Sequence, residues 1–94
     1  MNFVTYNGQC RYGNDKKTIL KKVDSDNDRE CQQNCVTTIG CAAVTFCSGC
    51  SQRCIMYRGG PYTYGDGRLG FTCYVMPGKH AYLENLKEIF WLKI

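Results

Sequence analysis

The sequence contains no apolar run long enough to cross a membrane. Residues 1–6 have neither the basic start nor the long apolar stretch of a signal peptide, so either a leader has been removed or the chain is one module of a longer protein. There is no Asn-x-Ser/Thr sequon, and we expect no N-linked sugar on this segment. The single histidine, His80, lies in the tail, away from any candidate nucleophile, and four of the eight acids are gathered in residues 24–30. We therefore expect no membrane span, no catalytic site, no bound metal and no cofactor.

Cysteine, by contrast, is abundant, with eight residues in a chain of 94. A chain of this size buries little apolar surface, and an even number of cysteines predicts a disulfide framework formed in an oxidising compartment. Each bridge contributes roughly 2–4 kcal/mol, chiefly by restricting the unfolded chain. We therefore predict a secreted or extracellular protein. The net charge of +4 neither requires nor excludes an acidic partner, and we expect no nucleic-acid partner.

The patterning predicts an α+β fold, with one small disulfide-rich domain over residues 1–76 and a helical tail over residues 77–94. Short β-branched and aromatic stretches between turn signals are typical of strands. We expect strands at 3–6, 41–47, 53–57 and 71–76, an exposed edge segment at 16–23, a helix within 26–40 and a long loop at 58–70. The helix has acidic start residues in front and Gly40 behind. Ser25 with Asp28 fits a capping box, and Asp26 or Asn27 are alternative caps.

Eight cysteines permit 105 pairings, and the geometry of the predicted elements reduces that number. Cys31 and Cys35 lie four residues apart and share one face of the helix. Cys35, near the helix end, is placed to meet the start of the next strand, and Cys31, one turn back, is placed to meet the second strand. Cys10 and Cys73, the outermost cysteines, then join the two ends of the domain. The two cysteines that are left, Cys47 and Cys50, close a turn. The predicted bridges are Cys35–Cys41, Cys31–Cys54, Cys10–Cys73 and Cys47–Cys50.

The segment Cys47-Ser48-Gly49-Cys50 has the Cys-x-x-Cys spacing of thiol oxidoreductases and of zinc knuckles. A redox pair usually lies at a helix N-terminus in a βαβ unit, whereas this pair lies between two predicted strands. Structural zinc sites usually contain two such knuckles, and only one is present. We interpret the pair as a structural turn bridge, with a redox bridge and a zinc site as the alternatives.

The order and spacing of these residues resemble the PAN/apple family. The segment Cys31-x3-Cys35-x5-Cys41-Ala-Ala-Val-Thr-Phe is followed by Cys54-Ile-Met-Tyr and then by Gly70-Phe-Thr-Cys73-Tyr. Over roughly residues 3–76 the chain is similar to plasminogen-type N-terminal and hepatocyte growth factor modules, which have a helix-to-sheet pair of bridges and an outer bridge linking the ends. The resemblance implies a curved antiparallel sheet cradling one helix, which binds protein or carbohydrate and has no catalytic site. The Cys47/Cys50 pair is an addition to that pattern, and the tail lies outside it.

The glycine-rich loop at 58–70 is the predicted ligand-binding surface. Two tyrosines offer flat faces for stacking on sugar rings or anchoring a protein, and neighbouring charges supply hydrogen bonds. The predicted ligand-binding residues are Arg58, Tyr62, Tyr64, Asp66 and Arg68. The alternative is that one tyrosine packs inward and the loop is only a connector.

Four lysines in the edge segment form a second, weaker candidate. They are Lys16, Lys17, Lys21 and Lys22. Because several relatives of the PAN/apple family bind sulfated glycans, the resemblance implies the same possibility here. The alternative is a solvated edge whose lysines discourage pairing with other chains.

The tail has an apolar stripe at helical spacing over residues 82–94 and predicts an amphipathic helix. Such a short helix is marginal alone and has to dock, either on its own domain or on another molecule. The leading functional interpretation is a non-enzymatic extracellular recognition module that binds protein or carbohydrate. The alternative is a structural module of a secreted or surface assembly that self-associates through residues 82–94.

Overall fold

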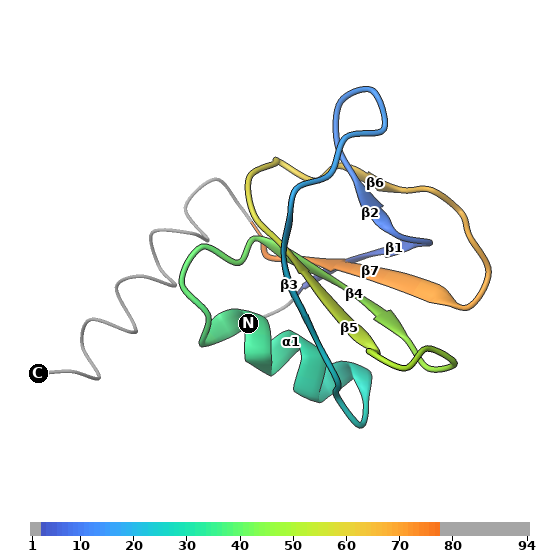
Figure 1. The fold of residues 1–94 in the computed structure, drawn as a ribbon. Helices are drawn as coiled ribbons and strands as arrows, with labels where there is room; N and C mark the ends of the chain where they lie inside the picture. Colours follow the sequence, from blue (N-terminus) through green and yellow to red (C-terminus); the bar gives the residue numbers. More distant parts are fainter. Residues whose placement is uncertain (1–2, 78–94) are drawn as a thin grey trace, which may run out of the picture.

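The computed structural model describes residues 3–77 as five strands in one sheet, a two-stranded ribbon and a helix (Figure 1). The strands and the helix, in chain order, are β1 (Val4–Asn7), β2 (Cys10–Arg11), β3 (Ile19–Val23), α1 (Asp28–Val36), β4 (Ala43–Cys47), β5 (Cys54–Tyr57), β6 (Tyr64–Gly65) and β7 (Phe71–Val75). The predicted helix at 82–94 lies outside the described residues. The α+β prediction is confirmed for the domain itself, which is mostly antiparallel sheet with one helix and four disulfides.

The main sheet has the strand order β1-β7-β4-β5-β3, with every neighbouring pair antiparallel. Helix α1 covers one face, and the ribbon of β2 and β6 lies on the other, so the domain has three layers (Figure 1). The predicted edge segment becomes β3, which is indeed an edge strand and carries a register shift between Ile19 and Lys21. Such an irregularity makes an open edge a poorer template for another strand.

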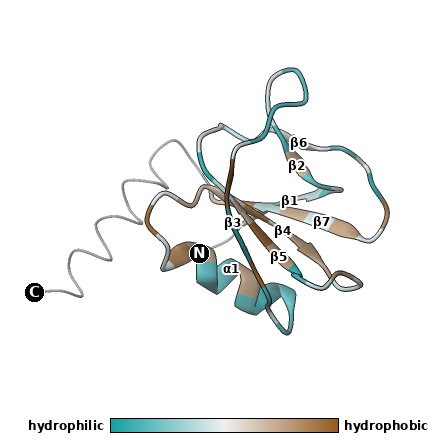
Figure 2. Ribbon diagram, viewed as in Figure 1, coloured by the Kyte–Doolittle hydropathy of each residue, from teal (hydrophilic) through white to brown (hydrophobic). Residues whose placement is uncertain are grey.

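Strand β4 is central and is buried on both faces. Val44 and Met56 face α1, together with the cysteines that tie the helix to the sheet. Ala43 and Tyr57 face the ribbon. Because alternate residues of a strand point to opposite faces, one five-residue strand serves two hydrophobic clusters. Figure 2 shows hydrophobic residues on the strands in the middle of the sheet and hydrophilic ones on part of α1 and on the connection between β2 and β3.

Helix α1 begins at an Asn27 cap, whose side-chain oxygen accepts a hydrogen bond of 2.9 Å from the Glu30 N–H. Asn27 is one of the two alternative caps that the sequence predicts. Ser25 does not cap the helix, because it is buried and its hydroxyl accepts a hydrogen bond from the Asn34 side chain. The first turn is also tied to the sheet, because the Tyr74 hydroxyl donates a hydrogen bond of 2.7 Å to Asp28. Burial, followed by this hydrogen bond and the carboxylate charge, raises the pKa of Tyr74 to about 12.

The structure contains the four predicted disulfides. Cys31–Cys54 and Cys35–Cys41 attach the helix to the sheet, and Cys10–Cys73 attaches the ribbon to the opposite face. The six cysteines of these bridges are fully buried. Cys47–Cys50 closes the turn between β4 and β5, as the structural interpretation predicted, and it leaves neither thiolate for zinc. Four bridges in so short a chain fit an oxidising, extracellular environment.

The ribbon was not predicted. The sequence predicts a loop at 58–70, yet this segment contributes β6, which pairs with β2 in the register Cys10↔Gly65 and Arg11↔Tyr64. A buried polar contact joins the ribbon to the sheet, since the Cys10 N–H donates to Thr45 Oγ1 at 3.1 Å. The Thr45 hydroxyl also shares a hydrogen bond of 2.8 Å with the Tyr57 hydroxyl. Burial raises the pKa of Tyr57, which keeps this hydroxyl protonated.

Within residues 3–77 no helix has the length and apolar character that crossing a bilayer requires.

Candidate functional site

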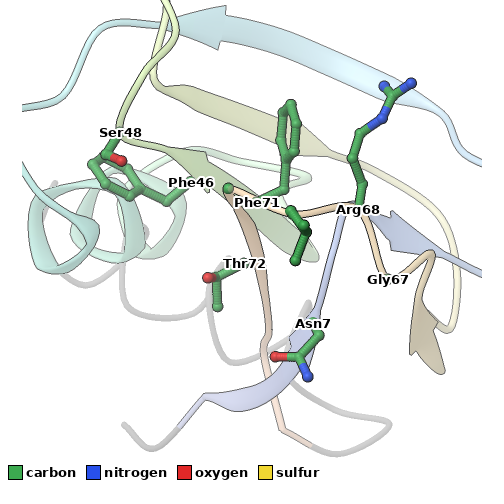
Figure 3. Close-up of a pocket in the computed structure, with 9 residues that line it drawn as sticks. Asn7, Phe46, Ser48, Gly67, Arg68, Phe71 and Thr72 are labelled. Carbon is green, nitrogen blue, oxygen red and sulfur yellow. The ribbon is translucent and has the colours of Figure 1, made fainter.

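A hollow of about 540 Å³ lies at the end of the sheet where β4 ends and β7 begins (Figure 3). Residues from the ends of β1 and β4, the start of β7 and the loop before β7 line it. They are Asn7, Phe46, Ser48, Thr72 and residues 67–71. Figure 3 shows the side chains of Arg68 and Phe71 extending to the same side. The hollow therefore lies where β1 and β4 end and β7, the strand between them, begins.

The dominant feature at its rim is Leu69, which is 94% exposed. It is the most exposed large hydrophobic residue in the described part of the chain. Its neighbour Arg68 is also exposed, and the guanidinium carbon lies 5.8 Å from the centre of the Phe71 ring. The arginine thus holds a cation–π position beside an exposed leucine. We call residues 66–71 the Leu69 loop.

The Leu69 loop is anchored at both ends by backbone hydrogen bonds to the turn after β1. At one end, the N–H groups of Asp66 and Gly67 donate to the carbonyls of Gln9 and Asn7, both at 3.0 Å. At the other end, the Gly8 N–H donates to the Phe71 carbonyl at 2.9 Å. Gly8 has a φ of 96°, a value that L side chains rarely adopt, and a Cβ there would overlap the loop. Leu69 is therefore displayed by a fixed turn.

Asp66 connects this turn to the interior. Its Oδ1 accepts hydrogen bonds from the N–H groups of Gln9 at 2.8 Å and Arg68 at 3.0 Å. Its Oδ2 lies 3.3 Å from the guanidinium of Arg11, whose side chain is only 8% exposed. Arg11 is further held by the Cys10 carbonyl, the Gln9 side chain and Asp15. A buried arginine therefore positions the carboxylate that organises the loop.

These contacts also set the charge of Asp66. Partial burial raises the pKa of its carboxyl group, but the N–H groups of Arg68 and Gln9 and the positive charge of Arg11 outweigh that effect. The pKa of Asp66 therefore lies below its ordinary value of 3.8. The carboxylate is charged at neutral pH. In this charged form it holds the N–H groups of Gln9 and Arg68 and the guanidinium of Arg11.

The predicted role of Tyr62 as an exposed stacking face does not agree with the structure, because Tyr62 is 3% exposed. Its hydroxyl donates to the Arg58 carbonyl at 2.6 Å and accepts from the Thr18 N–H at 3.1 Å. Its ring packs between Tyr12 and Tyr57, with ring centres 5.0 Å and 5.3 Å away. Burial raises the pKa of Tyr62. For Tyr62 the structure agrees with the part of the alternative in which one tyrosine packs inward.

The other predicted ligand-binding residues are divided between different places. Tyr64 is half-buried, and its hydroxyl accepts a hydrogen bond of 2.8 Å from the Asp15 N–H. Arg58 is exposed but lines a second hollow with Leu20. Of the five residues, only Arg68 lines the hollow of Figure 3, with Asp66 as its support.

All four predicted glycan-binding lysines are exposed. Lys21 pairs with Met56 and Lys22 with Ile55, so these two lysines point to opposite faces of the sheet. The four lysines thus do not present one basic face. Binding of a sulfated glycan stays a prediction.

The lining of the hollow combines apolar and polar side chains. It supplies two phenylalanine rings, a leucine, one guanidinium and the polar side chains of Asn7, Ser48 and Thr72. Among residues 3–77, no group of three or more histidine, cysteine or acidic side chains has a metal-holding arrangement. Leu69 is not among the predicted binding residues, although it is the one aliphatic side chain in the glycine-rich loop at 58–70 and this is a signal in the sequence.

Comparison of the chain with family models, with curated proteins and with solved structures gives no match.

Proposed function

We propose that this domain is a non-enzymatic extracellular recognition module that binds a protein partner through the Leu69 loop. The observation that carries the proposal is the 94% exposure of Leu69 on a loop fixed at both ends. A fixed loop loses little conformational entropy on binding, which favours recognition. Burial of one leucine side chain contributes about 1.5–3 kcal/mol, enough to anchor a contact.

A protein partner fits these residues better than a sugar does. Leu69 has neither a hydrogen-bonding group nor a flat ring face, and both are what a sugar ring needs. The two phenylalanines of the hollow are only partly exposed. Arginine and aromatic residues are enriched at protein interfaces, and Arg68 stands over Phe71 at the rim. We therefore expect a partner that offers an apolar pocket for Leu69 and a carboxylate for Arg68.

Two features support placing the domain in the PAN/apple class. The order of the bridges includes a helix-to-sheet pair and an outer bridge between the ends. The helix also packs on one face of an antiparallel sheet. Secretion is part of the same proposal, because four disulfides fit an oxidising compartment.

The test is binding of the immobilised chain to an array of secreted proteins and receptor ectodomains, with a glycan array in parallel. We expect a protein signal that Leu69→Asp and Arg68→Glu reduce more than tenfold, since each substitution removes over 1.4 kcal/mol of contact. The matched controls are Ile39→Asp and Arg29→Glu, which alter exposed residues away from the loop. Binding to glycans alone, or protein binding that Leu69→Asp leaves unchanged, would contradict the proposal.

A further inference from the structure

A second hollow, of about 490 Å³, lies at the opposite end of the sheet from the Leu69 loop. Its lining residues are Leu20, Ile39, Gly40, Ala42, Arg58 and Gly59. The hollow is mostly apolar, and Ile39 is 51% exposed beside it. It lies where β4 begins and β5 ends, whereas the Leu69 loop lies where β4 ends and β7 begins. The two surfaces are therefore separate sites.

The last described residues of the chain lie beside this second hollow. After β7, the Met76 N–H donates a hydrogen bond of 3.0 Å to the carbonyl of Ala42, one of the lining residues. The Ala42 N–H in turn donates to the Tyr57 carbonyl at 2.8 Å, just before Arg58. Pro77 is the last described residue. The remaining 17 residues, 78–94, thus begin next to an exposed apolar surface.

The sequence of that remainder is suited to this surface. At 100° per residue, one face of residues 82–94 carries only apolar side chains and Lys93. The apolar members are Tyr82, Leu83, Leu86, Ile89, Phe90 and Ile94. Thirteen residues at 1.5 Å each make a helix of about 20 Å. Such a helix is long enough to cross the sheet from β7 over β4 and β5 to β3, a distance of three strand spacings, or about 14 Å.

The connection is long enough as well. Residues 78–81 span up to about 13 Å when extended, so the first helical turn is within reach of Ala42. Arg58 is the one charged residue that lines the hollow, so the rest of the lining is free of charge. Glu84 and Glu88 lie one helical turn apart on the polar side of the tail sequence, so they face solvent when the apolar face is in the hollow.

We propose that residues 82–94 dock as an amphipathic helix on their own domain, with their apolar face in the hollow beside Ile39 and Ala42. Docking there covers Ile39 and leaves the Leu69 loop open. The inference does not depend on what the Leu69 loop binds.

Trp91 is the only tryptophan in the chain and lies off the apolar face, whereas Phe90 lies on it. The double variant Phe90→Trp/Trp91→Phe therefore places the sole tryptophan at the proposed contact. We expect its fluorescence to be shielded from acrylamide, and Ile39→Asp in that background to raise the quenching constant to the value of the denatured chain. Leu69→Asp, the matched control at the other hollow, leaves the quenching constant unchanged.

Three outcomes overturn the proposal. They are an unshielded tryptophan in the double variant, shielding that Ile39→Asp does not alter, and shielding that depends on protein concentration together with a dimer in sedimentation. The last result would assign the tail to a second copy. If Ile39→Asp does not fold, amide hydrogen exchange of the native chain is compared with that of a chain ending at Gly78. Faster exchange at Ile39 and Gly40 in the shorter chain supports docking, and equal exchange refutes it.

Discussion

Replacing Asp66 with Asn tests whether one carboxylate holds the Leu69 loop in place. The substitution keeps the shape of the side chain and the oxygen that accepts from Gln9 and Arg68, but it removes the charge facing Arg11. Hydrogen bonds to charged groups contribute about 1.5–3 kcal/mol each. Arg11 keeps its contacts with Asp15 and the Cys10 carbonyl, so we expect a loss of about 2 kcal/mol in the free energy of unfolding at pH 7.

The pH dependence follows from the direction of the Asp66 shift. The pKa of Asp66 is lowered in the folded state, so its contribution to stability is fully present well above its ordinary value of 3.8. The contribution is lost as the pH falls through the folded pKa, where the carboxylate is protonated. The difference in unfolding free energy between the native chain and Asp66→Asn should therefore be largest at neutral pH and disappear in strong acid.

Urea denaturation followed by circular dichroism, with the disulfides intact, measures this difference at each pH. Amide hydrogen exchange at Arg68 gives a local readout, since its N–H is bonded to Asp66, and exchange should be faster in the variant. Equal stability of the two proteins at pH 7, or a difference that persists unchanged in strong acid, would refute the role assigned to Asp66.

Two further predictions concern the rest of the scaffold. The pKa of Tyr74 is about 12, raised from 10.0, so its contribution to stability should be present below pH 10 and lost between pH 10 and 12. Tyr74→Phe should lack that alkaline loss, as measured by urea denaturation across this range. The Cys10–Cys73 bridge has a sequence separation of 63 and the Cys47–Cys50 bridge one of 3. In the chain-entropy model, replacing both cysteines of a bridge with Ser should cost about 4 kcal/mol for the first and about 2 kcal/mol for the second. Equal losses in denaturation would contradict that ordering.

The sequence was sufficient for the disulfide framework because the helix geometry restricts the pairings. Cys31 and Cys35 lie on one helical face, and their partners are Cys54 at the start of β5 and Cys41 just before β4. The helix and the four predicted strands were found for a related reason, since each carries a clear period or a clear boundary. Local sequence patterns therefore specify the sheet and the layer that covers one of its faces.

The second layer was not predictable in the same way. β2 and β6 have two residues each, too few to show a period, and their pairing joins positions more than fifty residues apart. That pairing is what buries Tyr62 and turns a predicted binding residue into a core residue. The same long-range contacts, through Asp66 and Gly8, expose Leu69. Which side chains of a glycine-rich loop face outward is decided by the surface on which the loop packs.

The most direct test of the central claim is the affinity of a captured extracellular protein for the native chain and for Leu69→Asp, both with native disulfides and unchanged circular dichroism. The account predicts that the dissociation constant of the variant is more than ten times higher, while Ile39→Asp binds as the native chain does. Equal dissociation constants for the native chain and Leu69→Asp would contradict it.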